Sequence, residues 1–161
     1  PLRERFGIVI PLNKYNLDEI QMILRMNLIK LKLKATDDAV YKISKSSKLN
    51  PRSVNRLLNR CYDTATVFDK NIIDSDIVDK TLDSLQLDHN GLNPDDYKIL
   101  EALISPAPIG VKNLSLKTGV DLEAIETNYE PYLISLNLME RTTKGRVITS
   151  KGVNYLVENN S

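Results

Sequence analysis

LMERTTKGRVITS, residues 138–150, differs from the helical spacing that dominates the rest of the chain. Apolar and polar side chains alternate on both sides of its centre, and the centre itself is polar and contains Gly145. Alternation with a period of two predicts strands, and a short glycine-containing segment between two such runs predicts a tight turn. We therefore expect a β-hairpin here, with its turn at Thr143, Lys144 and Gly145.

The segments around this hairpin predict a small domain. We predict its other elements from apolar side chains at helical spacing, from Asn-Pro and glycine residues at helix ends, and from a bend near Pro131. These are a helix at 93–105, a short extended piece at 108–111, a helix at 112–119, a helix at 121–138 and a final helix at 151–159. Helix, short strand, helix, helix and hairpin in this order are typical of a winged-helix domain, which we place at residues 91–161.

The first half of the chain predicts four short helices. Each begins with a side chain that can accept a hydrogen bond from the free backbone N–H groups of a helix start. These side chains are Asn16, Thr36, Asn50 and either Asp74 or Ser75. Glu19 completes a capping-box pattern with Asn16, and Pro51 follows Asn50 at the first helical position, where its missing N–H costs nothing. We expect one helical domain at residues 13–88, followed by a linker around Asn90 and Gly91.

Composition excludes several classes of protein. The chain has 161 residues, of which 42% are hydrophobic and 27% charged, so it can bury one modest core or two small ones. Its single cysteine, Cys61, excludes an internal disulfide, and no apolar run approaches the roughly 20 residues that span a bilayer. We expect a soluble, cytoplasmic protein without a membrane anchor, and a start at Pro1 favours a piece cut from a longer chain.

Positive charge is concentrated in the hairpin, although the net charge is only +1. A conventional winged-helix regulator places its third helix in the major groove of DNA. Here that helix is acidic, and a phosphate backbone would repel it; its carboxylates are Asp121, Glu123, Glu126 and Glu130. We therefore expect the hairpin to contact DNA phosphates without reading bases, through Arg141, Thr142, Thr143, Lys144 and Arg146. On composition alone, a polar hairpin tip that is merely a soluble turn is equally compatible.

Four separated blocks of the sequence resemble one known family. They are PLRERFGIV, NPRSVNRLLNRCYD, GLNPDDYKIL and IETNYEPYLISLNLMERTTKGRVIT. In order and spacing they resemble the C-terminal part of the RuvB family, the bacterial motors of Holliday-junction branch migration. The resemblance implies a mainly α fold, with the tail of a large AAA+ ATPase domain at residues 1–12, a helical AAA+ lid at 13–88 and the winged helix at 91–161.

The resemblance also implies roles for particular residues. Arg5 would be the arginine finger that acts on ATP bound by a neighbouring subunit, with Arg3 as an auxiliary basic group. Arg52, beside Pro51, would be the sensor 2 residue that contacts the phosphates of ATP in its own subunit. Because no G-x-x-x-x-G-K-[ST] segment is present, ATP and its Mg²⁺ would be held by a core domain upstream of Pro1, and this fragment alone should not hydrolyse ATP.

Partners follow from the same resemblance: the duplex DNA of Holliday junctions, RuvA through the absent large domain, and further copies of the intact protein in a hexamer. The family usually has Pro and Arg where this chain has Thr143 and Lys144, which implies a weaker grip on DNA. No spacing of cysteines and histidines indicates a metal site. The alternative is a non-catalytic DNA-binding regulator with a helical dimerisation domain.

Overall fold

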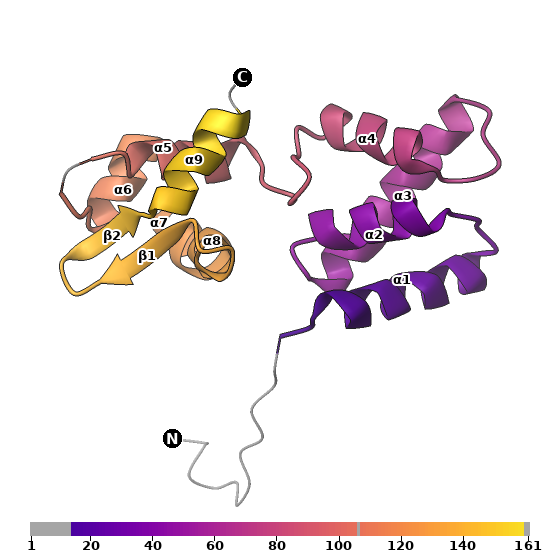
Figure 1. Ribbon diagram of the computed structural model, residues 1–161, viewed down its shortest axis with the longest axis horizontal. Helices are drawn as coiled ribbons and strands as arrows, with labels where there is room; N and C mark the ends of the chain where they lie inside the picture. Colours follow the sequence, from indigo (N-terminus) through magenta and orange to yellow (C-terminus); the bar gives the residue numbers. More distant parts are fainter. Residues whose placement is uncertain (1–13, 106, 160–161) are drawn as a thin grey trace, which may run out of the picture. The chain divides into compact units, whose positions relative to one another are not determined.

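The structure, a computed structural model, describes residues 14–105 and 107–159. The described chain is mainly helical and forms two compact units, the first ending at Thr81 and the second beginning at Leu82 (Figure 1). The tail of a large domain expected at residues 1–12 lies outside the described residues.

The first unit is a small helical bundle. Its helices are α1 (Leu17–Leu31), α2 (Asp37–Ser46), α3 (Pro51–Val67) and α4 (Ser75–Ser84), the last of which crosses the boundary between the units. The first three pack on one another and bury a core of aliphatic side chains. Fully buried residues of the unit include Ile20, Leu24, Val40, Ile43 and Val54, and Ile77 of α4 is also fully buried.

Local side chains define where these helices begin. The Asn16 side chain accepts a hydrogen bond from the backbone N–H of Glu19, and the Glu19 carboxylate accepts one from Asn16, which confirms the capping box. Thr36 caps α2 and Asn50 caps α3. For α4 the structure chooses Asp74 over Ser75, because the Asp74 carboxylate accepts from the backbone N–H of Ile77 at 3.0 Å.

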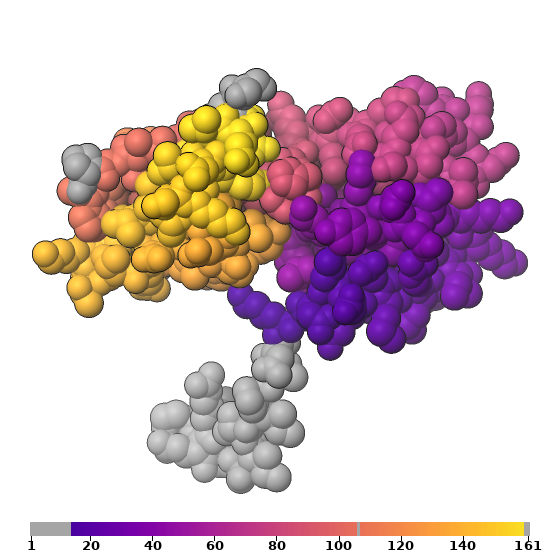
Figure 2. All heavy atoms as spheres, viewed as in Figure 1, coloured from indigo at the N-terminus to yellow at the C-terminus, as the bar shows by residue number. Residues whose placement is uncertain are grey.

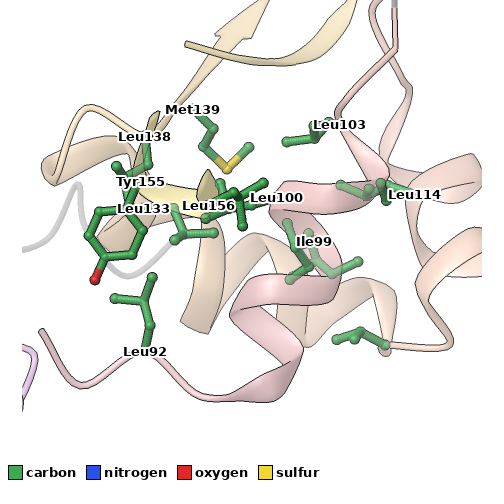
Figure 3. Packing of buried hydrophobic residues seen from close by; sticks show 13 residues of the cluster. Leu92, Ile99, Leu100, Leu103, Leu114, Leu133, Leu138, Met139, Tyr155 and Leu156 are labelled. Carbon is green, nitrogen blue, oxygen red and sulfur yellow. The ribbon is translucent and has the colours of Figure 1, made fainter. Parts of the chain in front are cut away.

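The second unit has the element order of a winged helix. It contains α5 (Pro94–Ala102), α6 (Val111–Thr118), α7 (Leu122–Ala124), η2 (Ile125–Tyr129), α8 (Glu130–Ser135), β1 (Met139–Thr142), β2 (Gly145–Ile148) and α9 (Ser150–Asn159). Side chains from the helices and from β1 meet in one apolar core (Figure 3). The core includes Leu92, Ile99, Leu100, Leu114, Leu133 and Met139.

The third helix of this unit is interrupted by a single π-helical turn, η2. The backbone N–H of Glu130 bonds the carbonyl of Ile125, five residues back. Pro131 comes next and has no N–H, and in a regular α-helix its ring would collide with the carbonyl four residues earlier. The wider turn before Pro131 avoids that collision, so the bend expected there takes the form of a π turn.

Candidate nucleic-acid interface

The hairpin forms where the alternating sequence predicts it. β1 and β2 are antiparallel, with Arg141 opposite Arg146 and Thr142 opposite Gly145. Thr143 and Lys144 make a two-residue turn, and the Thr142 hydroxyl donates to the carbonyl of Gly145 at 2.8 Å. Figure 2 shows this turn projecting from the surface of its unit.

Gly145 begins β2, rather than lying in the turn, and has a φ of 142°. The extended segment at Ile109 pairs with Arg146 through two backbone hydrogen bonds of 2.9 and 2.8 Å. A Cβ atom on Gly145 would lie only 2.7 Å from the carbonyl oxygen of Ile109. Glycine is therefore required here for two reasons. The backbone has a positive φ that other residues rarely adopt, and the backbone of Ile109 lies too close to leave room for a side chain.

Arg146 is buried, with 7% of its side chain exposed, and its guanidinium lies between two carboxylates. Its Nε and Nη2 donate to Oε2 of Glu130 at 3.1 and 2.9 Å, and Nη2 also donates to Oε1 of Glu126 at 2.8 Å. The sequence predicts Arg146 among the residues that contact DNA. The structure differs, because acids from η2 and α8 fold over the hairpin and pair with this arginine.

Arg141 lies directly across the hairpin from Arg146 but has a different environment. Its side chain is 62% exposed, and the nearest carboxylates, on Glu126 and Glu130, are each 3.7 Å away, beyond hydrogen-bond distance. Two like charges opposite each other on a hairpin repel. The carboxylates of Glu126 and Glu130 compensate for that repulsion, which leaves Arg141 as a cation at the surface.

Arg141, Thr142, Thr143 and Lys144 are all exposed in the structure. Thr142 also accepts a hydrogen bond from the backbone N–H of Lys144 at 3.2 Å, which fixes the turn. Of the five hairpin residues expected to contact DNA, the structure therefore brings four together at the surface and places Arg146 beneath them. Arg141 and Lys144 provide the exposed positive charge.

The third helix exposes less negative charge than its four carboxylates indicate, because most of them have partners in the structure. Asp121 accepts a hydrogen bond from the backbone N–H of Ala124 and caps α7, while Glu123 is exposed. Glu126 and Glu130 are both paired with Arg146. The repulsion expected from four carboxylates is thus reduced by one buried cation that comes from the hairpin.

Arg52 lies at the start of α3, in the position expected from the sequence. Its backbone N–H donates to the Asn50 side chain, and its guanidinium is exposed and has no ion-pair partner among the residues that the structure describes. Pro51 is the first residue of α3. An exposed guanidinium at the positive end of a helix is an arrangement that suits an anion. Arg3 and Arg5 lie outside the described residues.

No other site is apparent in the described residues. They contain no cluster of three or more side chains suited to a metal ion, and none of their helices is both long and apolar enough to cross a bilayer. Cys61 is buried in the first unit, and burial raises the pKa of its thiol to about 11. Such a thiol is protonated at neutral pH and is a poor nucleophile.

Asp88 is an organising residue that the sequence analysis missed. One carboxylate oxygen accepts from the backbone N–H groups of Asn90 and Leu92, both at 2.8 Å. The other accepts from the hydroxyl groups of Tyr97, at 2.7 Å, and Tyr155. Burial and this carboxylate together raise the pKa of both tyrosines above its usual range. The expected linker is therefore bonded to the winged helix from Asp88 onward, and the Asp-x-Asn pattern was the only local signal for it.

Comparisons with known proteins agree in both units. Residues 15–88 match the model of the RuvB AAA lid domain, and residues 89–157 match the model of the RuvB C-terminal winged helix domain. The Holliday junction branch migration complex subunit RuvB of Phytoplasma mali is 38% identical over 152 residues, which cover 92% of this chain and 46% of that protein. The same subunit from Leuconostoc mesenteroides is 37% identical over 159 residues, covering 97% of this chain and 45% of the relative.

A solved structure agrees with the fold of the chain. The Thermotoga maritima RuvB Holliday junction branch migration motor superposes with a TM-score of 0.90 at 34% identity, covering 97% of this chain and 53% of that one. The chain thus spans about half the length of the relatives that it matches.

Proposed function

Because the chain belongs to the RuvB family, with that family's lid domain at residues 15–88 and its winged-helix domain at residues 89–157, we propose that it is the C-terminal part of a hexameric, ATP-driven DNA translocase. The intact protein would move Holliday junctions in the cytoplasm during recombination and repair. In this proposal RuvA, the partner that binds the junction, docks on the large domain.

One observation carries the proposal for the winged helix: the hairpin presents exposed positive charge, and the third helix presents none. Arg141 and Lys144 are exposed around a narrow turn, whereas the third helix presents carboxylates. A third helix of that charge does not suit insertion into a major groove. Cations on a turn suit contact with phosphates, which are the same in every sequence.

The lid would transmit the state of ATP. In this proposal Arg52 contacts the phosphates of ATP bound by its own subunit, and Arg5 reaches the ATP of a neighbouring subunit. A guanidinium can neutralise the charge that develops on a transferring phosphoryl group. The ATP and its Mg²⁺ would be held by the ATPase core of the intact protein, so the present chain would bind DNA but not hydrolyse ATP.

DNA binding is tested first with the chain as it stands. Fluorescence anisotropy with several unrelated duplexes should give similar affinities that fall as salt rises, with a log–log slope of about −2 if Arg141 and Lys144 each contact one phosphate. Arg141→Ala and Lys144→Ala should each weaken all duplexes equally and reduce that slope by about 1. Lys98→Ala is the matched control, because Lys98 is an exposed cation of the same unit already paired with Asp95 at 2.8 Å.

The same assay separates the motor from the alternative. A regulator should prefer one sequence by roughly 10³-fold or more, and a competition assay showing such a preference would refute the proposal for the hairpin.

The two ATP-contacting arginines are tested in the full-length protein. Arg5→Ala should abolish ATP hydrolysis and leave ATP binding intact, since the residue acts on the neighbour's nucleotide. Arg52→Ala should reduce hydrolysis, whereas Arg56→Ala, one turn further along α3 and also exposed, should have little effect. Unchanged turnover in Arg5→Ala or Arg52→Ala would remove that residue from its proposed role.

A further inference from the structure

Two arginines and two carboxylates meet where the hairpin packs on the third helix of its unit. Glu126 lies 2.8 Å from Arg146 and 3.7 Å from Arg141, and Glu130 lies 2.9 and 3.7 Å from the same two arginines. The group therefore carries no net charge when all four side chains are ionised. Its members differ mainly in how far solvent reaches them.

Solvent exposure separates the two carboxylates. Glu130 is 3% exposed, its Oε2 accepts two hydrogen bonds from Arg146, and its Oε1 is buried without a hydrogen-bond partner. Glu126 is 36% exposed, and one of its oxygens, Oε1, lies close to both arginines. Glu130 is thus tied to the buried arginine, whereas Glu126 also reaches the surface on which Arg141 would meet a phosphate.

We propose that Glu126 is a positioning residue that limits the affinity of the hairpin for DNA by competing with phosphate for the Arg141 guanidinium. This inference rests on the proposed function and deepens it. Arg141 is attracted to Glu126 without a hydrogen bond to it, so a phosphate can displace that carboxylate. The displacement costs part of the binding energy, and the remaining negative charge repels the phosphate over distances of about 10 Å at 0.1 M salt.

A limited affinity is useful to a domain that moves along DNA. Differences in affinity between related complexes appear mostly in the dissociation rate, so a weaker contact is also a shorter one. When Arg141 releases a phosphate, the Glu126 carboxylate again neutralises part of its charge, and this favours release. The hairpin can then release one phosphate and bind the next.

Glu123 provides the control for this inference. It is an exposed carboxylate three residues earlier in the same helical segment, and no arginine pairs with it in the described structure. Glu126→Gln and Glu123→Gln remove the same charge from neighbouring sites. Only Glu126→Gln removes a competitor of phosphate for Arg141.

The test is anisotropy with two unrelated duplexes, measured from 50 to 200 mM salt. Glu126→Gln should bind both duplexes about two- to fivefold more tightly at 50 mM salt, the range expected for an exposed ion pair, and its salt dependence should steepen by up to ~0.9 in log–log slope. Glu123→Gln should change affinity by less than half as much. In an Arg141→Ala background, Glu126→Gln should give no more gain than Glu123→Gln. Circular dichroism shows whether each variant is folded, and Glu126→Ala serves as a second replacement.

Each outcome decides a different point. If the wild-type chain binds DNA and Glu126→Gln gives no gain, or a gain equal to that of Glu123→Gln, the inference is overturned while DNA binding by the hairpin stands. A gain from Glu126→Gln that is as large without Arg141 as with it also overturns it. If no folded variant binds either duplex, the proposed function of the hairpin fails, and the inference fails with it.

Discussion

Replacement of Arg146 by methionine should destabilise the winged-helix unit far more than the same replacement of Arg141, which lies opposite it in the hairpin. The side chain is 7% exposed and donates to two carboxylates, of which Glu130 is 3% exposed. Methionine keeps much of the apolar volume of arginine but removes its charge. Glu130 would then be a buried carboxylate without a cation, and that is the costly state.

The expected size of the effect follows from these contacts. Arg146 makes hydrogen bonds of 3.1, 2.9 and 2.8 Å to carboxylates. Hydrogen bonds between charged groups contribute about 1.5–3 kcal/mol each, and removing one partner of a buried ion pair costs about 3–5 kcal/mol in total. Because Glu126 can turn toward solvent, we expect a loss of about 3 kcal/mol in the free energy of unfolding of this unit.

Urea denaturation followed by the backbone NMR signals of Met139–Ile148 measures that loss in the right unit. Arg141→Met is the matched control, since Arg141 sits opposite on the same hairpin but is 62% exposed, and it should cost less than about 1 kcal/mol. The double variant Arg146→Met with Glu130→Met should recover most of the stability, because both buried charges are then gone. A cost for Arg146→Met no larger than that of Arg141→Met would refute the reasoning.

Three further predictions concern other parts of the chain. Asp88→Ala leaves two tyrosine hydroxyls and two backbone N–H groups without their acceptor. It should therefore lower the free energy of unfolding of the second unit by about 2–4 kcal/mol and speed hydrogen exchange at the Leu92 amide. Exchange at Leu92 as slow as in the wild type would contradict this. Gly145→Ala places a Cβ 2.7 Å from the Ile109 carbonyl and should cost more than about 2 kcal/mol by urea denaturation, with Gly110→Ala, where a Cβ meets open space, as control. Burial raises the pKa of Cys61 from 9.0 to about 11 in the folded chain, so the unfolded chain loses this proton first. The free energy of unfolding should therefore fall by about 2 kcal/mol as pH rises from 9 to 11. The same decline in Cys61→Ala would contradict this assignment.

Local sequence signals predicted much of the fold. Asn16, Thr36 and Asn50 each occupy the capping position that their side chains favour, and Gly119 ends α6 with a φ of 72°. These signals act over three or four residues and depend little on the rest of the chain. The hairpin was predicted for the same reason, since its strands and turn lie within one short stretch.

Contacts between distant residues were beyond sequence reasoning. Arg146 looks like Arg141 in the sequence, and only the packing of the third helix, 16–20 residues earlier, makes one of them buried and the other exposed. Asp88 is similar, because its tyrosine partners are 9 and 67 residues away. A hydrogen-bond donor or acceptor in a polar segment does not by itself indicate whether it will face water or a distant partner.

The π turn at Ile125–Tyr129 makes the length of this segment matter as much as its composition. An α-helix rotates by about 100° per residue. Removing one residue between Glu126 and Glu130 would rotate Glu130 and everything after it by about 100° relative to the helix before the deletion. A regular helix there would also bring the Pro131 ring against the carbonyl four residues before it. Side-chain replacements here change one contact at a time, whereas a single-residue deletion would change the register of everything from Glu130 to the hairpin.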